Sequence, residues 1–410
     1  MKSQELNVID DRGPAKYFHG RKQEINFFKH SLEQSQKRGL AKSILIQGPP
    51  GVGKTALIDE FKKNLTNIWR VIELNTIIDL ANPIQCAHLL IGRKKFQKKA
   101  KEIGLDLKVL KGKIEYEKTE ETISEIISLI DTPTLLILDE AQMAEIQLTK
   151  GSDPWRQVSV ILNGLHNLKN EHGFVCLFGG LSNTQNIFHD FKISRFYTNA
   201  IIDLQRIDQS SEKAILKDYI VQEAHVDPHH PDLDHWLDQL SKETLQWPHH
   251  IVCYAETASK MLKKHNGVLS DHVLGTILGK GLALKNDYYQ RRFYKISPRM
   301  RCFIYHAIFE NEMNPSTIDV DTVLDDFELN PYIKEPKKTW NDLVSRGIVQ
   351  VQGNGFYQIP IPSMRTWMIG QYQAYCQTIS LKPSMKIQRM FDTLTSSKTK
   401  DLNSEIKPTD

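Results

Sequence analysis

The chain has 410 residues, of which 40% are hydrophobic and 25% charged, and its formal net charge is +4. This length predicts about two or three domains with enough apolar surface to bury a sizeable core. Such a small charge does not by itself indicate a nucleic-acid-binding protein, and no segment has the roughly 20 consecutive apolar residues that span a bilayer. Because residues 1–13 lack the apolar core of a secretory signal, we expect a cytoplasmic protein with no membrane partner.

The five cysteines lie far apart and form no C-x-x-C pair. This spacing predicts buried thiols in a reducing compartment rather than metal ligands. The cysteines are Cys86, Cys176, Cys253, Cys302 and Cys376.

A glycine-rich loop follows the short apolar run at residues 43–47, which we predict to be a buried strand. The loop satisfies the pattern G-x-x-x-x-G-K-[ST], and a helix is expected to begin at Lys54. Inward-facing backbone N–H groups and the positive end of a helix both favour a phosphate chain. We therefore expect Lys54 to reach the β- and γ-phosphates and Thr55 to ligate Mg²⁺. The motif consists of Gly48, Pro49, Pro50, Gly51, Val52, Gly53, Lys54 and Thr55.

Residues 92–118 form a basic stretch, with ten lysines and arginines against four acidic residues, which is a local charge of +6. Such a stretch could follow the phosphate backbone of DNA, but most basic runs are solvated helix faces, and both interpretations stay open.

An acidic pair, Asp139 and Glu140, ends a predicted strand within residues 132–142. A parallel strand delivers both carboxylates to the sheet edge where the phosphates would lie. Asp139 would orient Mg²⁺ through its water shell, and Glu140 would polarise the water that attacks the γ-phosphate. The alternative is a pair that only caps the next helix. An Asp-Glu pair favours hydrolysis of ATP, and no N-K-x-D pattern for guanine follows, so we infer adenine.

Two further polar residues follow predicted strands. After the strand at 173–180, Asn183, with Ser182 in reserve, is a candidate to hold the water near the γ-phosphate, although a turn explains it equally well. Arg195 precedes a strand at 200–204, where an arginine can reach the γ-phosphate bound by a neighbouring subunit. The alternative for Arg195 is a surface ion pair with an acid such as Asp190.

Together these motifs, with "YFHGRKQEINFF" (17–28), "GGLSNT", "SRF" and "WPHHIVCYA" (247–255), resemble the AAA+/STAND-type ATPases. They are most similar to Orc1-like ATP-binding proteins with a C-terminal winged helix, over roughly residues 17–370. The resemblance implies an α/β fold: a P-loop core with a parallel sheet of the ASCE type. It also makes Phe18, Gly20 and Arg21 candidates for wrapping the adenine, although Arg21 could instead pair with Glu24 at a helix start.

The resemblance further implies a helical lid, whose first helix we expect Ser210 or Ser211 to cap. Where the family often offers an arginine to the γ-phosphate, this chain has Pro248-His249-His250. His249 could donate a hydrogen bond but gives much less electrostatic stabilisation than a guanidinium. It could equally pack at a helix start.

Residues 298–372 have the element order of a winged helix: helices at 298–310, 319–327 and 337–347, then a hairpin at 348–360 that turns at 353–355. Its third helix carries residues suited to a DNA groove, although Trp340 also has core spacing and the domain could dock on protein instead. These residues are Lys337, Lys338, Trp340, Asn341 and Arg346.

The expected organisation leaves a terminal segment on each side, and the end of the second is predicted to be disordered. The segments are an N-terminal extension (1–16), the ATPase core (17–205), the lid (206–283), a linker (284–297), the winged helix (298–372) and a tail (373–410).

We therefore predict an ATP-binding and ATP-hydrolysing switch, with ATP and Mg²⁺ as cofactors and possible ATP-dependent homo-oligomers. Its nucleotide state would control engagement of DNA or of a protein partner. The alternatives are a DNA-loading or transposition-type ATPase and a signalling or defence switch. A metabolic P-loop kinase is the weakest alternative, because no acceptor site is evident.

Overall fold

The computed structural model describes residues 15–102, 129–169, 171–191, 201–310, 318–319, 335–351 and 356–378. By its contacts the chain divides into two compact units. The first contains residues 10–48 and 52–205, and the second contains residues 206–410 together with the short segment 49–51. Arg195, most of the basic stretch (103–118) and the predicted wing turn lie outside the described residues.

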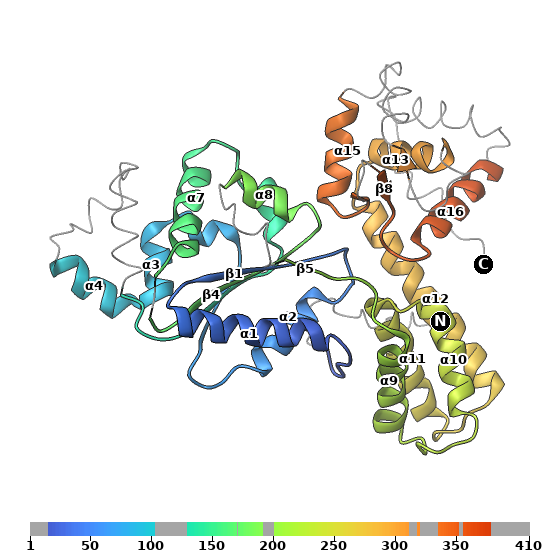
Figure 1. The fold of residues 1–410 in the computed structure, drawn as a ribbon. Coiled ribbons are helices and arrows are strands. Elements are labelled where there is room, and N and C mark those ends of the chain that lie inside the picture. The colour runs from blue at the N-terminus through green and yellow to red at the C-terminus, as the bar shows by residue number, and fades with distance from the viewer. Residues whose placement is uncertain are drawn as a thin grey trace. The chain divides into compact units, whose positions relative to one another are not determined.

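A parallel five-stranded sheet, in the order β2-β3-β4-β1-β5, organises the first unit. Every residue of β3 and β4 is buried, which is the pattern of strands covered on both faces. Helices lie on both faces, with α1 and α2 on one and α7 on the other (Figure 1). The predicted α/β fold with a parallel sheet is confirmed. The strands are β1 (Lys42–Gln47), β2 (Arg70–Leu74), β3 (Thr134–Leu138), β4 (Phe174–Gly180) and β5 (Ile201–Asp203).

The helices of this unit connect the strands by crossovers, as a parallel sheet requires. The helices are α1 (Lys22–Arg38), α2 (Lys54–Lys63), η1 (Ile77–Leu80), α3 (Pro83–Ile91), α4 (Arg93–Glu102), η3 (Ala141–Met143), α6 (Ala144–Gln147), α7 (Asp153–His166) and α8 (Thr184–Asp190).

Three of the cysteines are buried free thiols, as predicted: Cys86 and Cys176 in this unit and Cys253 in the second. Burial raises the pKa of the Cys86 thiol to about 12.

Helices also make up the start of the second unit. The side chain of Asp208 accepts a hydrogen bond from the N–H of Ser211 at 2.8 Å and so caps the first helix. The expected cap at Ser210 or Ser211 was wrong, because the helix begins earlier, at Gln209, and both serines lie in its first turn. The helices are α9 (Gln209–Asp218), η5 (Tyr219–Glu223), α10 (Leu233–Thr244), α11 (Pro248–Lys264) and α12 (Asp271–Tyr294).

Helix α12 continues without interruption through residues 284–294, which the sequence suggested as part of a linker. One of the glycines that indicated a boundary, Gly281, has a packing role instead. A Cβ on Gly281 would lie 2.4 Å from ring carbons of Tyr254 in α11, so only glycine lets the two helices approach this closely.

The rest of the unit has a three-stranded antiparallel sheet, in the order β6-β8-β7, and the winged helix stays a prediction because residues 320–334 lie outside the described part. Asp319 lies in a strand rather than at the start of the expected helix, whose other residues are outside the described part. Trp340 is 2% exposed and belongs to the core, so it is not available to a DNA groove. The elements are α13 (Pro298–Glu310), β6 (Ile318–Asp319), α15 (Pro336–Ser345), β7 (Gln350–Val351), β8 (Phe356–Gln358) and α16 (Met364–Thr378).

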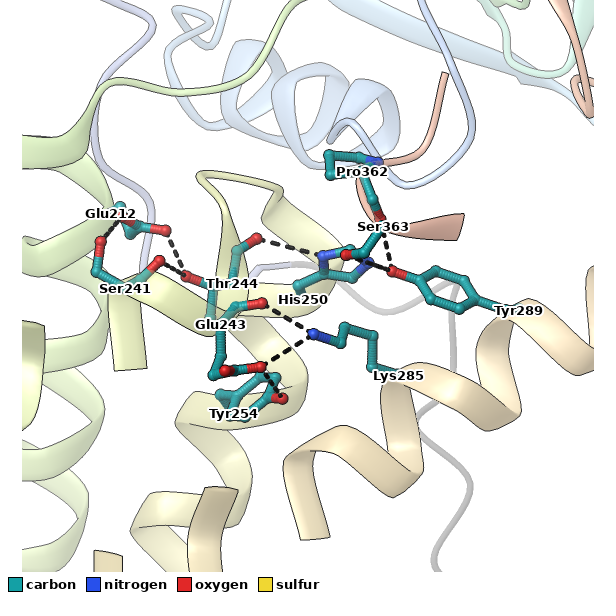
Figure 2. A network of polar contacts seen from close by, with 10 residues as sticks. All are labelled: Glu212, Ser241, Glu243, Thr244, His250, Tyr254, Lys285, Tyr289, Pro362 and Ser363. Atoms are coloured by element: carbon teal, nitrogen blue, oxygen red, sulfur yellow. Dashed lines mark hydrogen bonds and ion pairs between the residues drawn. The ribbon is translucent and has the colours of Figure 1, made fainter. Parts of the chain in front are cut away.

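A buried carboxylate, Glu212, ties α9 to the end of α10 (Figure 2). It accepts hydrogen bonds from the hydroxyls of Ser241 and Thr244 and, at 2.8 Å, from the N–H of Gln246. Hydrogen bonds to a charged group are worth about 1.5–3 kcal/mol each, so this cluster fixes the relative placement of the two helices.

A second group of contacts fastens α12 to its neighbours (Figure 2). Lys285 Nζ lies 3.1 Å from the carbonyl oxygen and 3.3 Å from the carboxylate of Glu243. Further along, the hydroxyl of Tyr289 donates to the carbonyl of Pro362, just before α16, at 2.6 Å and lies 3.0 Å from Nε2 of His250. A polar bridge therefore joins α11 and α12 to the segment that precedes α16.

None of the helices that the structure describes has an apolar run of the length that a transmembrane span needs.

Candidate nucleotide-binding site

The glycine-rich loop lies between the end of β1 at Gln47 and the start of α2 at Lys54, as predicted. Gly53 is the N-cap of α2 and has a φ of 96°, in the left-handed region that favours glycine. No side chain caps this helix, so its first N–H groups point into the loop. A phosphate chain matches both these donors and the positive end of the helix dipole.

The side chain of the loop lysine, Lys54, is held in place by the loop itself. Lys54 is 7% exposed, and its Nζ donates to the carbonyl of Gly48 at 3.0 Å. The ammonium therefore lies across the loop it belongs to, where it can neutralise phosphate charge.

The loop threonine meets the acid at the end of β3. The hydroxyl of Thr55 donates to Oδ2 of Asp139 at 2.7 Å, although the residues are 84 positions apart. A hydroxyl and a carboxylate oxygen in contact are the hard ligands that suit Mg²⁺. The residues predicted to hold the metal are therefore brought together and fit it.

Glu140 is exposed and has a φ of 54°, an uncommon conformation for a residue other than glycine. Its N–H donates to Oδ1 of Asp139 at 2.9 Å, so one acid orients the backbone of the next. Its carboxylate accepts a hydrogen bond from the side-chain amide of Gln142. Sequence reasoning missed Gln142, although it lies in the same "LDEAQ" motif.

The end of β4 approaches the same place, because β4 lies between β3 and β1 in the sheet. A Cβ on Gly179 would lie 2.3 Å from Oδ1 of Asp139. Beyond the strand, Nδ2 of Asn183 donates to the carboxylate of Glu145 at 3.2 Å, and neither Ser182 nor Asn183 has a described contact with Glu140.

The residues expected to wrap the adenine lie just before α1. Arg21 is the N-cap of that helix, its guanidinium is 3.3 Å from the carboxylate of Glu24, and it also donates to the carbonyl of Gln205. The pairing with Glu24 that we kept as an alternative is thus present. Phe18 and Gly20 are half-buried.

His249 lies in the first turn of α11, in the unit that also includes the loop tip at 49–51. Its N–H donates to the carbonyl of Gly51 at 3.1 Å, and its ring stacks on Tyr288 with centroids 3.7 Å apart. Its Nδ1 is 3.6 Å from Sγ of Cys253. His249 therefore packs at a helix start, as one of the two expectations had it, and the donation of a hydrogen bond to the γ-phosphate stays a prediction.

Part of the chain matches a known protein family. The AAA ATPase domain family matches residues 17–152, which confirms the AAA+ resemblance for that part of the chain. No curated protein sequence matched the chain.

Among solved structures, the ORC2 protein of Aeropyrum pernix in its ADPNP–ADP complexes is 13% identical, with a TM-score of 0.51 over 89% of this chain and 98% of that one. Its ADP form is 14% identical, with a TM-score of 0.50 over 94% and 98%. This likeness concerns the fold, which is that of an Orc-like P-loop ATPase.

Proposed function

We propose that this protein is a Mg²⁺-dependent ATPase that works as a switch, in which ATP and ADP favour different conformations of the lid and winged helix. One observation carries the proposal: the hydroxyl of Thr55 meets the carboxylate of Asp139, and Glu140 follows directly. A chance glycine turn would not require an acid pair at this point of the sheet.

Lys54 would hold the β- and γ-phosphates, and the N-terminus of α2 would bind the chain of phosphates through its N–H groups. Thr55 and Asp139 would hold Mg²⁺, directly or through its water shell. When bound, Mg²⁺ would neutralise the charge that develops on the phosphate oxygens.

Glu140 would act as the base that polarises the attacking water. It is exposed and so has access to water, and its backbone is fixed by Asp139. Asn183 and Arg195 remain proposed as the sensor and as the arginine acting between subunits; an ATP-dependent homo-oligomer follows only if Arg195 acts in this way.

The output would be a change in what the chain binds. The Aeropyrum pernix relative was solved in complexes with two different nucleotides, ADPNP and ADP, which supports a switch with the same fold. Exposed basic side chains favour DNA as the partner over protein: Arg93, Lys94 and Lys98 on α4, and Lys337, Lys338 and Arg346 in the winged helix.

The decisive experiment replaces Glu140 with Gln, which keeps the shape of the side chain but removes the carboxylate. ATP should bind with nearly unchanged affinity and be hydrolysed at least about 100-fold more slowly. Glu33→Gln is a matched control, because Glu33 is exposed on α1 in the same unit. Wild-type turnover in Glu140→Gln would refute the assigned base. Equal binding of DNA and protein by the ATP- and ADP-loaded variant would refute the switch.

The choice of nucleotide is tested separately by thermal stability. ATP with Mg²⁺ at 100 times its dissociation constant should stabilise the fold by about 2.7 kcal/mol, and GTP by much less. Lys54→Ala should abolish the shift. Equal shifts with ATP and GTP would contradict the adenine assignment.

A further inference from the structure

Gln142 is a buried polar residue beside the proposed base, and the functions assigned so far do not account for it. It lies in η3, two residues after Glu140, and is 3% exposed. A buried amide without hydrogen-bond partners destabilises a fold, so the contacts of Gln142 are needed for stability at least.

Both ends of the Gln142 amide are engaged. Its Nε2 donates to Oε2 of Glu140, and its Oε1 accepts from the N–H of Leu181 at 3.3 Å. Leu181 is the first residue after β4, and the segment leads directly to Asn183. One side chain thus connects the acid after β3 with the loop after β4.

The orientation of this amide follows from its partners. An ionised carboxylate only accepts hydrogen bonds, and a backbone N–H only donates them. A flipped amide would place oxygen against carboxylate and NH₂ against N–H, so only one orientation satisfies both neighbours. The donor facing Glu140 is therefore fixed by the fold.

We propose that Gln142 is a positioning residue for the Glu140 carboxylate, which it holds in one orientation while its carbonyl ties that orientation to the end of β4. This inference rests on the proposed function, because it presumes that Glu140 activates water. Gln142 touches no reacting atom; it acts by limiting where the base can lie, and a misplacement of about 1 Å can cost about 100-fold in rate.

A positioning role differs from a purely structural one in that it changes kcat and leaves ATP affinity nearly unchanged. Gln142→Glu keeps an oxygen for the N–H of Leu181 but places a second carboxylate against Glu140. Two carboxylates at hydrogen-bond distance repel each other, so the Glu140 side chain should leave its position and kcat should fall.

The experiment measures kcat, KM and ATP affinity of the full chain. For Gln142→Glu we expect kcat to fall at least about 10-fold with ATP affinity changed less than about twofold. For Gln142→Leu we expect kcat to fall about 10- to 100-fold, again with ATP affinity changed less than about twofold. Gln147→Glu is the matched control, since it makes the same charge change on the exposed side of α6 and should leave kcat unchanged.

Wild-type kcat in Gln142→Glu would overturn the inference, and so would a loss of ATP affinity as large as the loss of kcat. Equal losses of kcat in Gln142→Glu and Gln147→Glu would also overturn it, because the effect would then be general electrostatics. If Gln142→Leu does not fold, the kcat and ATP affinity of Gln142→Glu still decide. If the proposed function itself is wrong, Glu140→Gln will hydrolyse ATP at the wild-type rate, and that result is independent of the Gln142 variants.

Discussion

The hydroxyl of Thr55 donates to Oδ2 of Asp139 at 2.7 Å and so joins the first turn of α2 to the end of β3. Neighbouring strands of a parallel sheet carry their loops at one edge, and β4 alone separates β1 from β3. The contact therefore brings the phosphate loop to the carboxylate that the proposed cation needs.

Asp139→Asn tests this relationship, because it keeps a side-chain oxygen and removes the charge. We expect Mg²⁺ to tighten ATP binding at least about 10-fold less in the variant than in wild type, since charge-assisted contacts are about twice as strong as neutral ones. Titration with a fluorescent ATP analogue, with and without Mg²⁺, measures this. Asp190→Asn, on exposed Asp190, should behave as wild type, and undiminished Mg²⁺ enhancement in Asp139→Asn would contradict the assignment.

Two glycines of α12 should respond oppositely to alanine. Gly279 is exposed with nothing within 4 Å of an added Cβ, so Gly279→Ala should stabilise the helix by up to about 1 kcal/mol. Gly281→Ala should destabilise by about 1–3 kcal/mol, because the new methyl would overlap the ring of Tyr254. Urea unfolding followed by circular dichroism compares them. Equal effects would mean that α11 and α12 are not packed this closely.

Acid should destabilise the second unit through His250, in the first turn of α11. Burial, with the positive charges of His249 and Lys285, lowers the pKa of His250 to about 3, so between the ordinary value near 6.5 and pH 3 the unfolded chain binds a proton that the folded one does not. Stability is then complete above about pH 6.5 and falls by about 2 kcal/mol at pH 5. His250→Gln should remove this loss, measured as the difference in unfolding free energy between pH 7 and pH 5.

His235→Gln serves as the control for this measurement, because His235 is exposed on α10 and should not alter the pH dependence. A steeper loss on acidification in His250→Gln would reverse the interpretation. It would show that the hydroxyl of Tyr289 and the carbonyl of Thr244 hold the imidazole protonated.

The basic helix α4 should determine part of any salt dependence of DNA binding. Arg93, Lys94 and Lys98 are solvent-exposed, whereas Lys95 pairs with Asp131 at 2.7 Å and is less available. If each of the three contacts one phosphate, their replacement by Gln should reduce the log–log salt slope by about 2.7. ATP hydrolysis should not change. An unaltered salt slope would mean that α4 is a solvated helix face that does not contact DNA.

The glycine-rich loop between strand and helix, and the position of the acid pair at a strand end, could be predicted because both patterns are local; their roles toward phosphate and water stay predictions. In residues 48–55 the glycines, the lysine and the threonine follow one another, and the apolar runs on either side already indicate strand and helix. The same holds for Asp139 and Glu140 at the end of a fully apolar strand. Strand order was not needed to name these residues, although it was needed to bring them together.

Other features depend on neighbours that are distant in sequence. From the sequence Gly281 indicates a domain boundary, but in the structure Tyr254 packs against it. The sequence allows Trp340 to enter a DNA groove or a hydrophobic core, and its ring contacts with Phe303 and Tyr357 show that it lies in the core. The proposed role of Gln142 depends on the hydrogen bond from the N–H of Leu181, at the end of β4, to its side-chain carbonyl. A residue's type sets which hydrogen bonds and contacts it can make, but the packing of strands and helices decides which partners it meets, and only the tertiary structure contains that information.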